Sequence, residues 1–387
     1  MINSLIRLSL LTMVFCSLSF CQNDKAVVRV TNPSARDRNS ETITVNFTSL
    51  PPGLVKVSGS IVVRDSASGT VILSQAVDSD FDGIPESIIF QSEFKAKKSK
   101  SFFLATTGER TSNVSSLVDA RFVEPRQDLA WENDRIAHRV YGPALAAESN
   151  NGIDVWTKRV RSLIIKKWYE GEEEKPPVVY HIDHGEGADF FNVGRSLGCG
   201  STGIWSNDKV LQPGVFSSYR LIATGPLRAC FELRYDKWNV GGAKFSETKR
   251  ITLDAGQNLS KIEVTYKNWD NVNEIEIAGG LVKRSNTSVS QNKEHTWMSL
   301  WGIVNDDSVN GSLGTGIVFP ASSVTRFTED ADQYLIIGTS KPGSTFTYYS
   351  GAGWTRSGDF TSAQDWNAYL DAFALNVRSP MLVAIQR

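Results

Sequence analysis

The sequence predicts an all-β protein with a small N-terminal β-sandwich followed by a large antiparallel unit of packed sheets. Short runs rich in β-branched residues recur along the 387 residues, and Gly, Pro, Asn and Asp separate them. Several later runs are long and follow one another in series, as strands of two large packed sheets do. At roughly 150 residues per domain, the length indicates two domains. We place them at residues 22–110 and 121–387.

The charge balance argues against two classes of ligand. The chain has 41 basic and 42 acidic residues, so no overall field directs it to nucleic acid or to a membrane surface. We therefore expect no nucleic-acid partner and no membrane insertion. An anionic ligand would need a local cluster of Arg or Lys. Oligomeric state is not encoded in any pattern we recognise.

Residues 1–21 read as a secretory signal peptide. Arg7 supplies the basic region, and residues 8–20 form an apolar run too short to span a bilayer. We expect a soluble periplasmic or secreted protein. A lipoprotein anchor at Cys21 is less favoured, because the large Phe20 precedes it. The two remaining cysteines, Cys199 and Cys230, could pair in an oxidising compartment if their geometry allows.

The first unit contains five short β-type runs. An Asp- and Gly-rich segment, residues 78–86, lies between the last two runs. Its alternating Asp78, Asp80 and Asp82, followed by Gly83, resemble the start of a calcium loop. The alternative is an ordinary hairpin turn rich in Asp and Gly. The expected strands are residues 27–30, 42–47, 61–64, 71–73 and 87–90.

The second unit begins with an alternating segment, residues 131–141, which predicts one strand. Residues 153–169 then carry apolar side chains at a helical spacing, with basic side chains on the other side. We interpret that basic side as a solvated helix face. The remaining elements are antiparallel strands and one short helix. The expected strands are residues 219–223, 229–235, 248–253, 261–266, 314–319, 334–338, 345–349 and 381–385, and the expected helix is 361–375.

Residues 180–200 are the densest polar segment of the chain. They include His181 and His184, two of only four histidines, and five glycines that let the backbone turn tightly. A segment so poor in aliphatic residues is not explained by packing. We interpret it as the floor of an active site. Its other candidate side chains are Asp183, Glu186, Asp189 and Arg195.

Three roles are open for the two histidines. They could act in acid–base catalysis, because imidazole titrates near neutral pH. They could bind a divalent metal with the nearby carboxylates, or they could be hydrogen-bonded structural residues. Arg195 could bind a substrate carboxylate, and its alternative role is an internal salt bridge to Asp189.

Other site candidates lie far away in the sequence. Arg139 and Tyr141 share one face of the strand expected at residues 131–141, and Tyr219 begins a later strand. Trp354 and Arg356 belong to a second Gly-rich loop, where the indole could stack on a sugar and the guanidinium could bind an anion. A packed loop with a surface salt bridge is the alternative. The chain lacks phosphate-binding, dinucleotide and nucleophile-elbow motifs.

Five segments are distinctive in combination: residues 131–137, 141–145, 152–156, 181–187 and 351–354. Together they resemble a family long catalogued as a domain of unknown function, one branch of which is similar to the ulvan oligosaccharide dehydratases. The resemblance covers about residues 121–387, and the strand series is similar to the galactose-mutarotase-like supersandwich. It implies that residues 121–387 are the catalytic β-supersandwich domain.

The resemblance implies a hydro-lyase that removes water from the non-reducing terminal uronic acid of an acidic, sulfated oligosaccharide. The product would carry a 4,5-unsaturated uronyl end. Such a reaction needs a cation on the substrate carboxylate, a base and an acid. For catalysis we select His184, His181, Arg195, Tyr141 and Asp189, and for substrate binding Arg139, Arg356, Trp354, Glu186 and Tyr219.

No cofactor is required for this chemistry. A divalent metal at His181 and His184, or calcium at Asp78, Asp80 and Asp82, is the alternative expectation. Two other functions remain open. A polysaccharide lyase would use the same elimination but expel a sugar in place of water, and a periplasmic glycan-binding protein would do neither.

Overall fold

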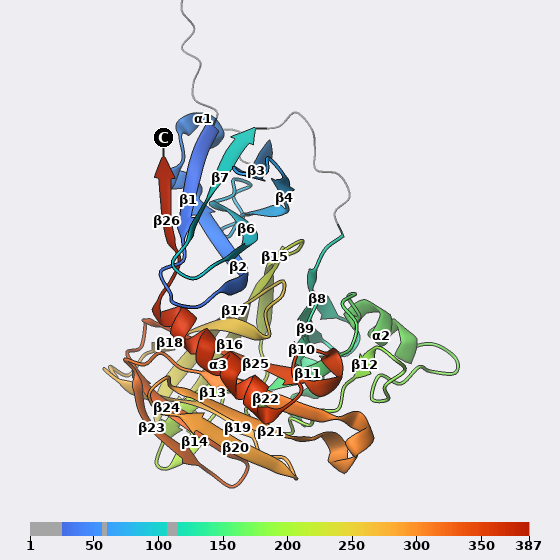
Figure 1. The fold of residues 1–387 in the computed structure, drawn as a ribbon. Helices are drawn as coiled ribbons and strands as arrows, with labels where there is room; N and C mark the ends of the chain where they lie inside the picture. The colour runs from blue at the N-terminus through green and yellow to red at the C-terminus, as the bar shows by residue number, and fades with distance from the viewer. Residues whose placement is uncertain (1–24, 56–59, 107–114, 387) are drawn as a thin grey trace, which may run out of the picture.

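The computed structural model describes residues 25–55, 60–106 and 115–386. The expected signal peptide, residues 1–21, lies outside the described residues. Strands dominate the fold and pair antiparallel in several sheets, which confirms the predicted all-β class (Figure 1). Among the described helices, none has the length and hydrophobicity needed to cross a bilayer.

The first unit is a sandwich of two sheets around an apolar core. One sheet has the order β26-β1-β7-β3-β4, and the other has the order β2-β6-β5. Val28, Phe90 and Phe102 are fully buried between them. A short helix, α1 (Pro52–Val55), lies at one end. The strands are β1 (Lys25–Thr31), β2 (Arg38–Asn46), β3 (Ile61–Asp65), β4 (Val71–Ile72), β5 (Ser74–Val77), β6 (Ser87–Phe94), β7 (Ser99–Thr106) and β26 (Leu382–Gln386).

The C-terminal strand β26 lies in the first unit, although residues 381–385 are expected from the sequence to belong to the second. It pairs antiparallel with β1, with Arg29 opposite Ala384. Figure 1 shows β26 in red beside the blue β1. Helix α3 (Ala363–Arg378) leads the chain back to that edge. Local sequence cannot reveal this pairing, because the two partners lie at opposite ends of the chain.

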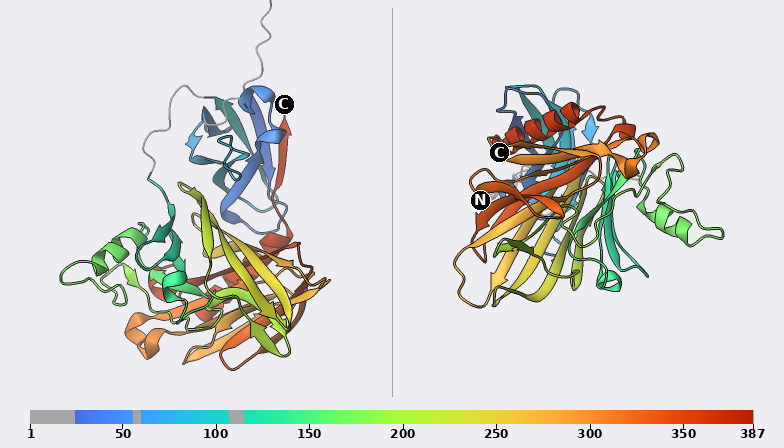
Figure 2. Two further views of the ribbon diagram at one scale, coloured as in Figure 1. Left: turned by 180° about the vertical axis from the view of Figure 1, so that it is seen from behind. Right: turned by 90° about the horizontal axis from the view of Figure 1, so that it is seen from below.

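The second unit consists of three antiparallel sheets. Their orders are β12-β11-β10-β9-β8, β14-β13-β19-β24-β23 and β15-β16-β17-β18-β25-β22-β21-β20. One continuous apolar core lies between them, and α3 covers β21 and β22 of the large sheet (Figure 2). The strands of the first of these sheets are β8 (Val118–Val123), β9 (Asp128–Asn133), β10 (Ala137–Val140), β11 (Ile153–Lys158) and β12 (Gly187–Ala188).

The other two sheets of this unit hold the longer strands. Those of the second five-stranded sheet are β13 (Cys199–Ser206), β14 (Lys209–Leu211), β19 (Ile275–Val282), β23 (Val324–Glu329) and β24 (Gln333–Ser340). Those of the eight-stranded sheet are β15 (Ser218–Thr224), β16 (Arg228–Val240), β17 (Ala243–Asp254), β18 (Leu259–Asn268), β20 (Thr287–Asn292), β21 (Trp297–Ile303), β22 (Ser312–Val318) and β25 (Thr345–Trp354).

Residues 131–141 form a hairpin, so the single strand predicted there is wrong. The chain reverses between β9 and β10, where the Asn133 side chain accepts hydrogen bonds from the backbone N–H groups of Arg135 and Ile136. Such a local side-chain bond favours a turn over a continuous strand. As a result His138 and Trp131 stand opposite each other and stack at 5.2 Å between ring centroids.

The helix predicted at residues 153–169 is also wrong in its first half. Residues 153–158 form β11, and the helix α2 covers only Ile165–Glu172. Every residue of β11 is buried, because apolar side chains cover both faces of this sheet. A strand that is buried on both faces shows no alternation of apolar and polar residues, so its sequence lacks the period of two. Trp156 and the later apolar residues therefore matched a helical spacing by coincidence.

The two described cysteines do not form a disulfide. Cys199 and Cys230 are both free and buried. The thiol of Cys199 contacts the carbonyl of Gly351, and that of Cys230 accepts a hydrogen bond from Thr252. Burial raises the pKa of Cys199 to about 12, so this thiol is not a nucleophile at neutral pH.

Candidate active site

Arg139 on β10 is the centre of a buried ionic cluster. Its side chain is 6% exposed and lies among three carboxylates. Its guanidinium donates to Asp154 at 2.7 Å, to Asp189 at 2.8 Å and to the Tyr180 hydroxyl at 3.0 Å. A third carboxylate, that of Asp128, lies 3.5 Å away. These contacts hold Arg139 within the cluster, and the substrate-binding role expected for it stays a prediction.

The cluster holds one guanidinium against three buried carboxyl groups. Burial raises the pKa of Asp128. Burial, together with the neighbouring Asp154, raises the pKa of Asp189 well above its usual range. Tyr141 donates its hydroxyl proton to Asp154 at 2.9 Å. The predicted catalytic residue Tyr141 therefore supports the cluster, because its proton is committed to Asp154.

His181 lies at the solvent side of this cluster. Its side chain is 53% exposed, while that of Asp189 is 1% exposed. Nδ1 of His181 lies 3.0 Å from the backbone carbonyl of Asp189 and 3.5 Å from its carboxylate. A carbonyl oxygen can only accept, so Nδ1 carries the proton of the neutral ring. Nε2 is then left with a lone pair, as a general base requires.

A glycine brings the loop back to the sheet so that Asp189 reaches Arg139. Gly187 is the first residue of β12 and has a φ of +119°. A Cβ on it would lie 2.0 Å from the carbonyl oxygen of Thr157. Only glycine allows this approach. The pairing of β12 with β11 sets Thr157 opposite Ala188, and Asp189 follows directly.

His184 lies on the outer part of the same loop. Its Nε2 contacts the carbonyl of Val179 at 3.2 Å, and the residue lines a cavity of about 260 Å³ beside α2. Glu186, predicted to bind substrate, accepts hydrogen bonds from Lys167 at 2.8 Å and Trp168 at 3.3 Å. Partial burial opposes ionisation of Glu186, but these two bonds lower its pKa. Glu186 therefore connects the loop to α2 through these two hydrogen bonds.

Two arginines meet the loop at Asp183. Arg159 donates to this carboxylate at 2.9 Å, and Arg356 lies 3.5 Å from the same oxygen. Their side chains are 34% and 33% exposed. Two cations on one carboxylate leave a net positive charge next to the histidines. Arg356 is one of the substrate-binding residues expected from the sequence. Arg159 belongs to the basic side of residues 153–169, which was interpreted as a solvated helix face, but residues 153–158 form the strand β11.

Three other predicted site residues lie elsewhere. Trp354 is 1% exposed and donates to the carbonyl of Asn310, so it cannot stack on a sugar. Tyr219 stacks on Phe122 of β8 at 4.5 Å between centroids, and β8 is the edge of its sheet opposite to β12. Arg195 donates to the carbonyl of Ala147. The salt bridge considered between Arg195 and Asp189 is absent, because Arg139 holds Asp189.

The two metal expectations stay predictions. In the turn between β5 and β6, oxygen atoms of Asp78, Asp80, Asp82 and Glu86 lie within 4.8 Å of one another. The Asp78 carboxylate already accepts from two backbone N–H groups of this turn. Within the described part of the chain, neither loop histidine joins a group of three potential metal ligands.

Sequence reasoning missed the carboxylates that position Arg139. Asp128 begins β9, and Asp154 lies in β11, directly across from Arg139. Each is a lone Asp in a strand, and its burial depends on the strand pairing. An Asp within an otherwise apolar strand was the one available signal, since a charged residue is rarely buried unless it is paired.

Comparisons with known proteins agree with this architecture. The protein is similar to "Uncharacterized protein P7" of Formosa agariphila, with 29% identity over 395 residues and 96% of each chain covered. Its fold is similar to that of an alpha-mannosidase from Enterococcus faecalis V583, with a TM-score of 0.52 and 11% identity. That match covers 94% of this chain but 46% of the mannosidase, so this chain spans less than half of that enzyme.

A family match extends over most of the chain. Residues 30–383 match the family described as "Domain of unknown function (DUF4861)". The match runs from β1 to β26 and so includes both units. On this match, the chain belongs to the DUF4861 family.

Proposed function

We propose that this protein is a carbohydrate-active enzyme, a hydro-lyase that removes water from the terminal uronic acid of an acidic oligosaccharide. The observation that carries the proposal is the half-exposed His181, whose Nδ1 is held by Asp189 while Nε2 has no hydrogen-bond partner among the described residues. Residues 181–187, which contain His181 and His184 and which we call the histidine loop, resemble the ulvan oligosaccharide dehydratases, and this resemblance supports the substrate class. The fold shared with a solved alpha-mannosidase is compatible with a role in carbohydrate processing.

The proposed reaction is an elimination. Nε2 of His181 takes the proton from C5 of the uronic acid, and the electrons of that C–H bond form the C4–C5 double bond. The C4–O bond breaks, and the hydroxyl group leaves as water after it gains a proton. Substrate thus becomes the unsaturated product plus one water. His184 is the candidate for the acid, because it lies three residues along the same loop.

The C5 proton is only weakly acidic, so the adjacent carboxylate must meet positive charge as the proton leaves. Arg159 and Arg356 supply that charge in the proposal, because both lie on Asp183 in the histidine loop and are partly exposed. Arg139 and Asp189 are positioning residues. They hold the ring of His181 through Asp189, and we expect them to act only in this way.

One incubation separates the reaction classes. Saturated uronyl-ended oligosaccharides are mixed with the protein, and ultraviolet absorbance and product mass are followed. A dehydratase gives new absorbance, loss of one water and no shortening. A polysaccharide lyase gives absorbance with shorter products, a glycosidase gives shorter products without absorbance, and a binding protein gives neither. Any of the last three results contradicts the proposal.

Histidine variants then test the site. His181→Gln should lower kcat by about 100-fold or more, the usual contribution of a general base. His295→Gln is the matched control, because His295 pairs with Asp371 on α3 and has no contact with the histidine loop. Full activity in both His181→Gln and His184→Gln would refute the assignment. Loss of activity on chelation, restored by one divalent metal, would favour the metal interpretation over proton transfer.

A further inference from the structure

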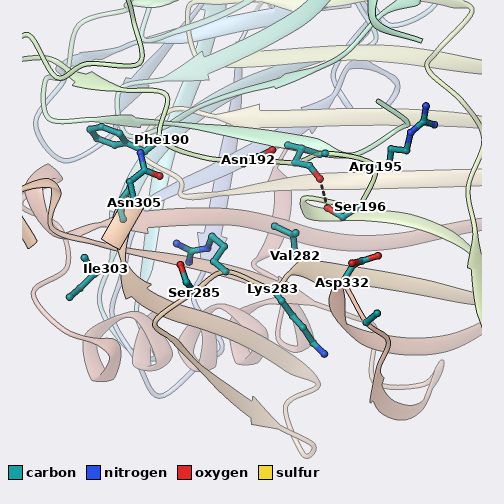
Figure 3. A pocket seen from close by; sticks show the side chains of 15 residues that line it. Phe190, Asn192, Arg195, Ser196, Val282, Lys283, Ser285, Ile303, Asn305 and Asp332 are labelled. Carbon is teal, nitrogen blue, oxygen red and sulfur yellow. Dashed lines mark hydrogen bonds between the residues drawn. The ribbon is translucent and has the colours of Figure 1, made fainter. Parts of the chain in front are cut away.

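A second polar cavity, of about 510 Å³, opens where strands β19 and β21 of the second unit end. Its walls come from the loop before β13, the ends of β19 and β21, and the turn between β23 and β24. In Figure 3, Phe190 and Asn305 lie at one end and Arg195 and Asp332 at the other. Phe190 follows directly on Asp189, so this wall continues from the proposed catalytic loop.

Arg284 is the unusual residue in this wall. Its Nε is buried and has no hydrogen-bond partner among the described residues. One terminal nitrogen donates to the carbonyl of Leu313 at 3.0 Å, and the guanidinium lies 5.8 Å from the centre of the Phe191 ring. No described carboxylate forms an ion pair with it. Burial lowers the pKa of Arg284 to about 10, so the group still carries its charge at neutral pH.

A partly buried guanidinium without a counter-charge is costly, and proteins usually pair such a group. The other two cationic side chains of the cavity already have partners within the protein. Lys283 pairs with Glu329 at 2.7 Å and donates to the carbonyl of Asp330. Arg195 is exposed and donates to Ala147. Asp332, the only acidic residue in the lining, is exposed and pairs with no described cation.

We propose that this cavity is a binding site for the oxyanion of an acidic sugar, a carboxylate or a sulfate ester, with Arg284 as its anchor. The guanidinium offers donors to two oxygens at once, while the amides of Asn192 and Asn305 offer further donors from the walls. The proposal rests on the proposed function for the sugar part of the ligand. It would give the enzyme a second contact to substrate, next to the histidine loop.

The experiment measures binding without turnover. The full-length protein is titrated calorimetrically with glucuronate, with glucose 6-sulfate and with glucose, at constant ionic strength. We expect the two anionic sugars to bind and glucose to bind weakly or not at all. Tighter binding of glucuronate identifies a carboxylate site, and tighter binding of glucose 6-sulfate identifies a sulfate site. Equal binding of all three sugars would overturn the proposal.

Charge variants test the anchor. Arg284→Gln should weaken the binding of the preferred anionic sugar about tenfold or more, because a hydrogen bond to a charged group is lost, and Arg284→Lys should lie between. Arg326→Gln is the control, since Arg326 pairs with Glu276 on the same sheet but does not line the cavity. Unchanged affinity in a folded Arg284→Gln protein would refute the anchor.

Two exposed residues keep the test valid if Arg284 variants fold poorly. Asp332→Asn removes the carboxylate from the lining and should tighten binding, whereas Asn305→Asp adds one and should weaken it, each by about fivefold for one close charge in water. Changes of the same sign, or none, would contradict the proposal.

The outcome separates this inference from the proposed function. If binding depends on Arg284 but no elimination occurs, the binding site stands and the proposed reaction is wrong. If elimination occurs at the normal kcat/KM in Arg284→Gln, the reaction stands and this inference is wrong.

Discussion

Replacing Arg139 with methionine tests whether the buried cluster both stabilises the fold and orients His181. The side chain is 6% exposed, and it lies within 3.5 Å of three carboxylates and bonds one phenol. Removing one partner of a buried ion pair costs about 3–5 kcal/mol, because the remaining charges lose their compensation. We therefore expect Arg139→Met to lower the free energy of unfolding by about that amount, with a further loss of kcat through His181.

The loss of unfolding free energy in Arg139→Met should depend on pH in a defined direction. Burial already raises the pKa values of Asp128 and Asp189, and the charge of Arg139 opposes that rise. Without Arg139 the folded-state pKa values rise further above the unfolded values. Stability from such groups is present at low pH and is lost as the pH increases through the raised pKa. The deficit should thus be larger at pH 8 than at pH 5.

Equilibrium unfolding in urea, followed by tryptophan fluorescence at the two pH values, measures this deficit. Arg326→Met is the control, because its pair with Glu276 is exposed and should contribute less than about 1 kcal/mol. A deficit in Arg139→Met as small as that of the control, or one equal at both pH values, would refute the cluster as described.

Two further predictions concern buried groups nearby. Burial lowers the pKa of His138 to about 4. Between pH 6.5 and 4 only the unfolded chain binds a proton at His138. The free energy of unfolding should therefore decrease by up to about 3 kcal/mol as the pH falls through this range. A His138→Gln protein measured alongside should not show this part of the decrease. Lys158 pairs with Glu132 at 2.5 Å, both fully buried. Lys158→Met should destabilise more than Lys158→Met combined with Glu132→Gln; additive losses in urea unfolding would contradict this coupling.

The long strands of the second unit were predictable because one of their faces is buried and the other is not. In β17, buried and less buried residues alternate along almost the whole strand, and the expected strand at residues 248–253 lies inside it. β11 was not predictable in this way, because all six of its residues are buried. Alternation, the main sequence signal of a strand, disappears when both faces are covered.

The candidate site was predictable in part. The concentration of His181, His184 and carboxylates within one Gly-rich segment indicated a polar loop, and His181 and Asp189 do lie together. Two of the other candidate residues were predicted less well. Arg195 and Trp354 were selected for their neighbours in sequence, but the fold turns Arg195 toward Ala147 and buries Trp354.

The sequence by itself determined the β class of the protein and the position of its histidine loop. Both follow from local patterns: alternating burial along strands, and a concentration of histidines, carboxylates and glycines within one short segment. Only the tertiary structure decided which charges meet. Asp128, Arg139, Asp154 and Asp189 come from four segments, and strand pairing places them around one guanidinium. The protonation and orientation of a side chain depend on the groups within a few ångströms of it, and those groups are set by contacts between distant parts of the chain.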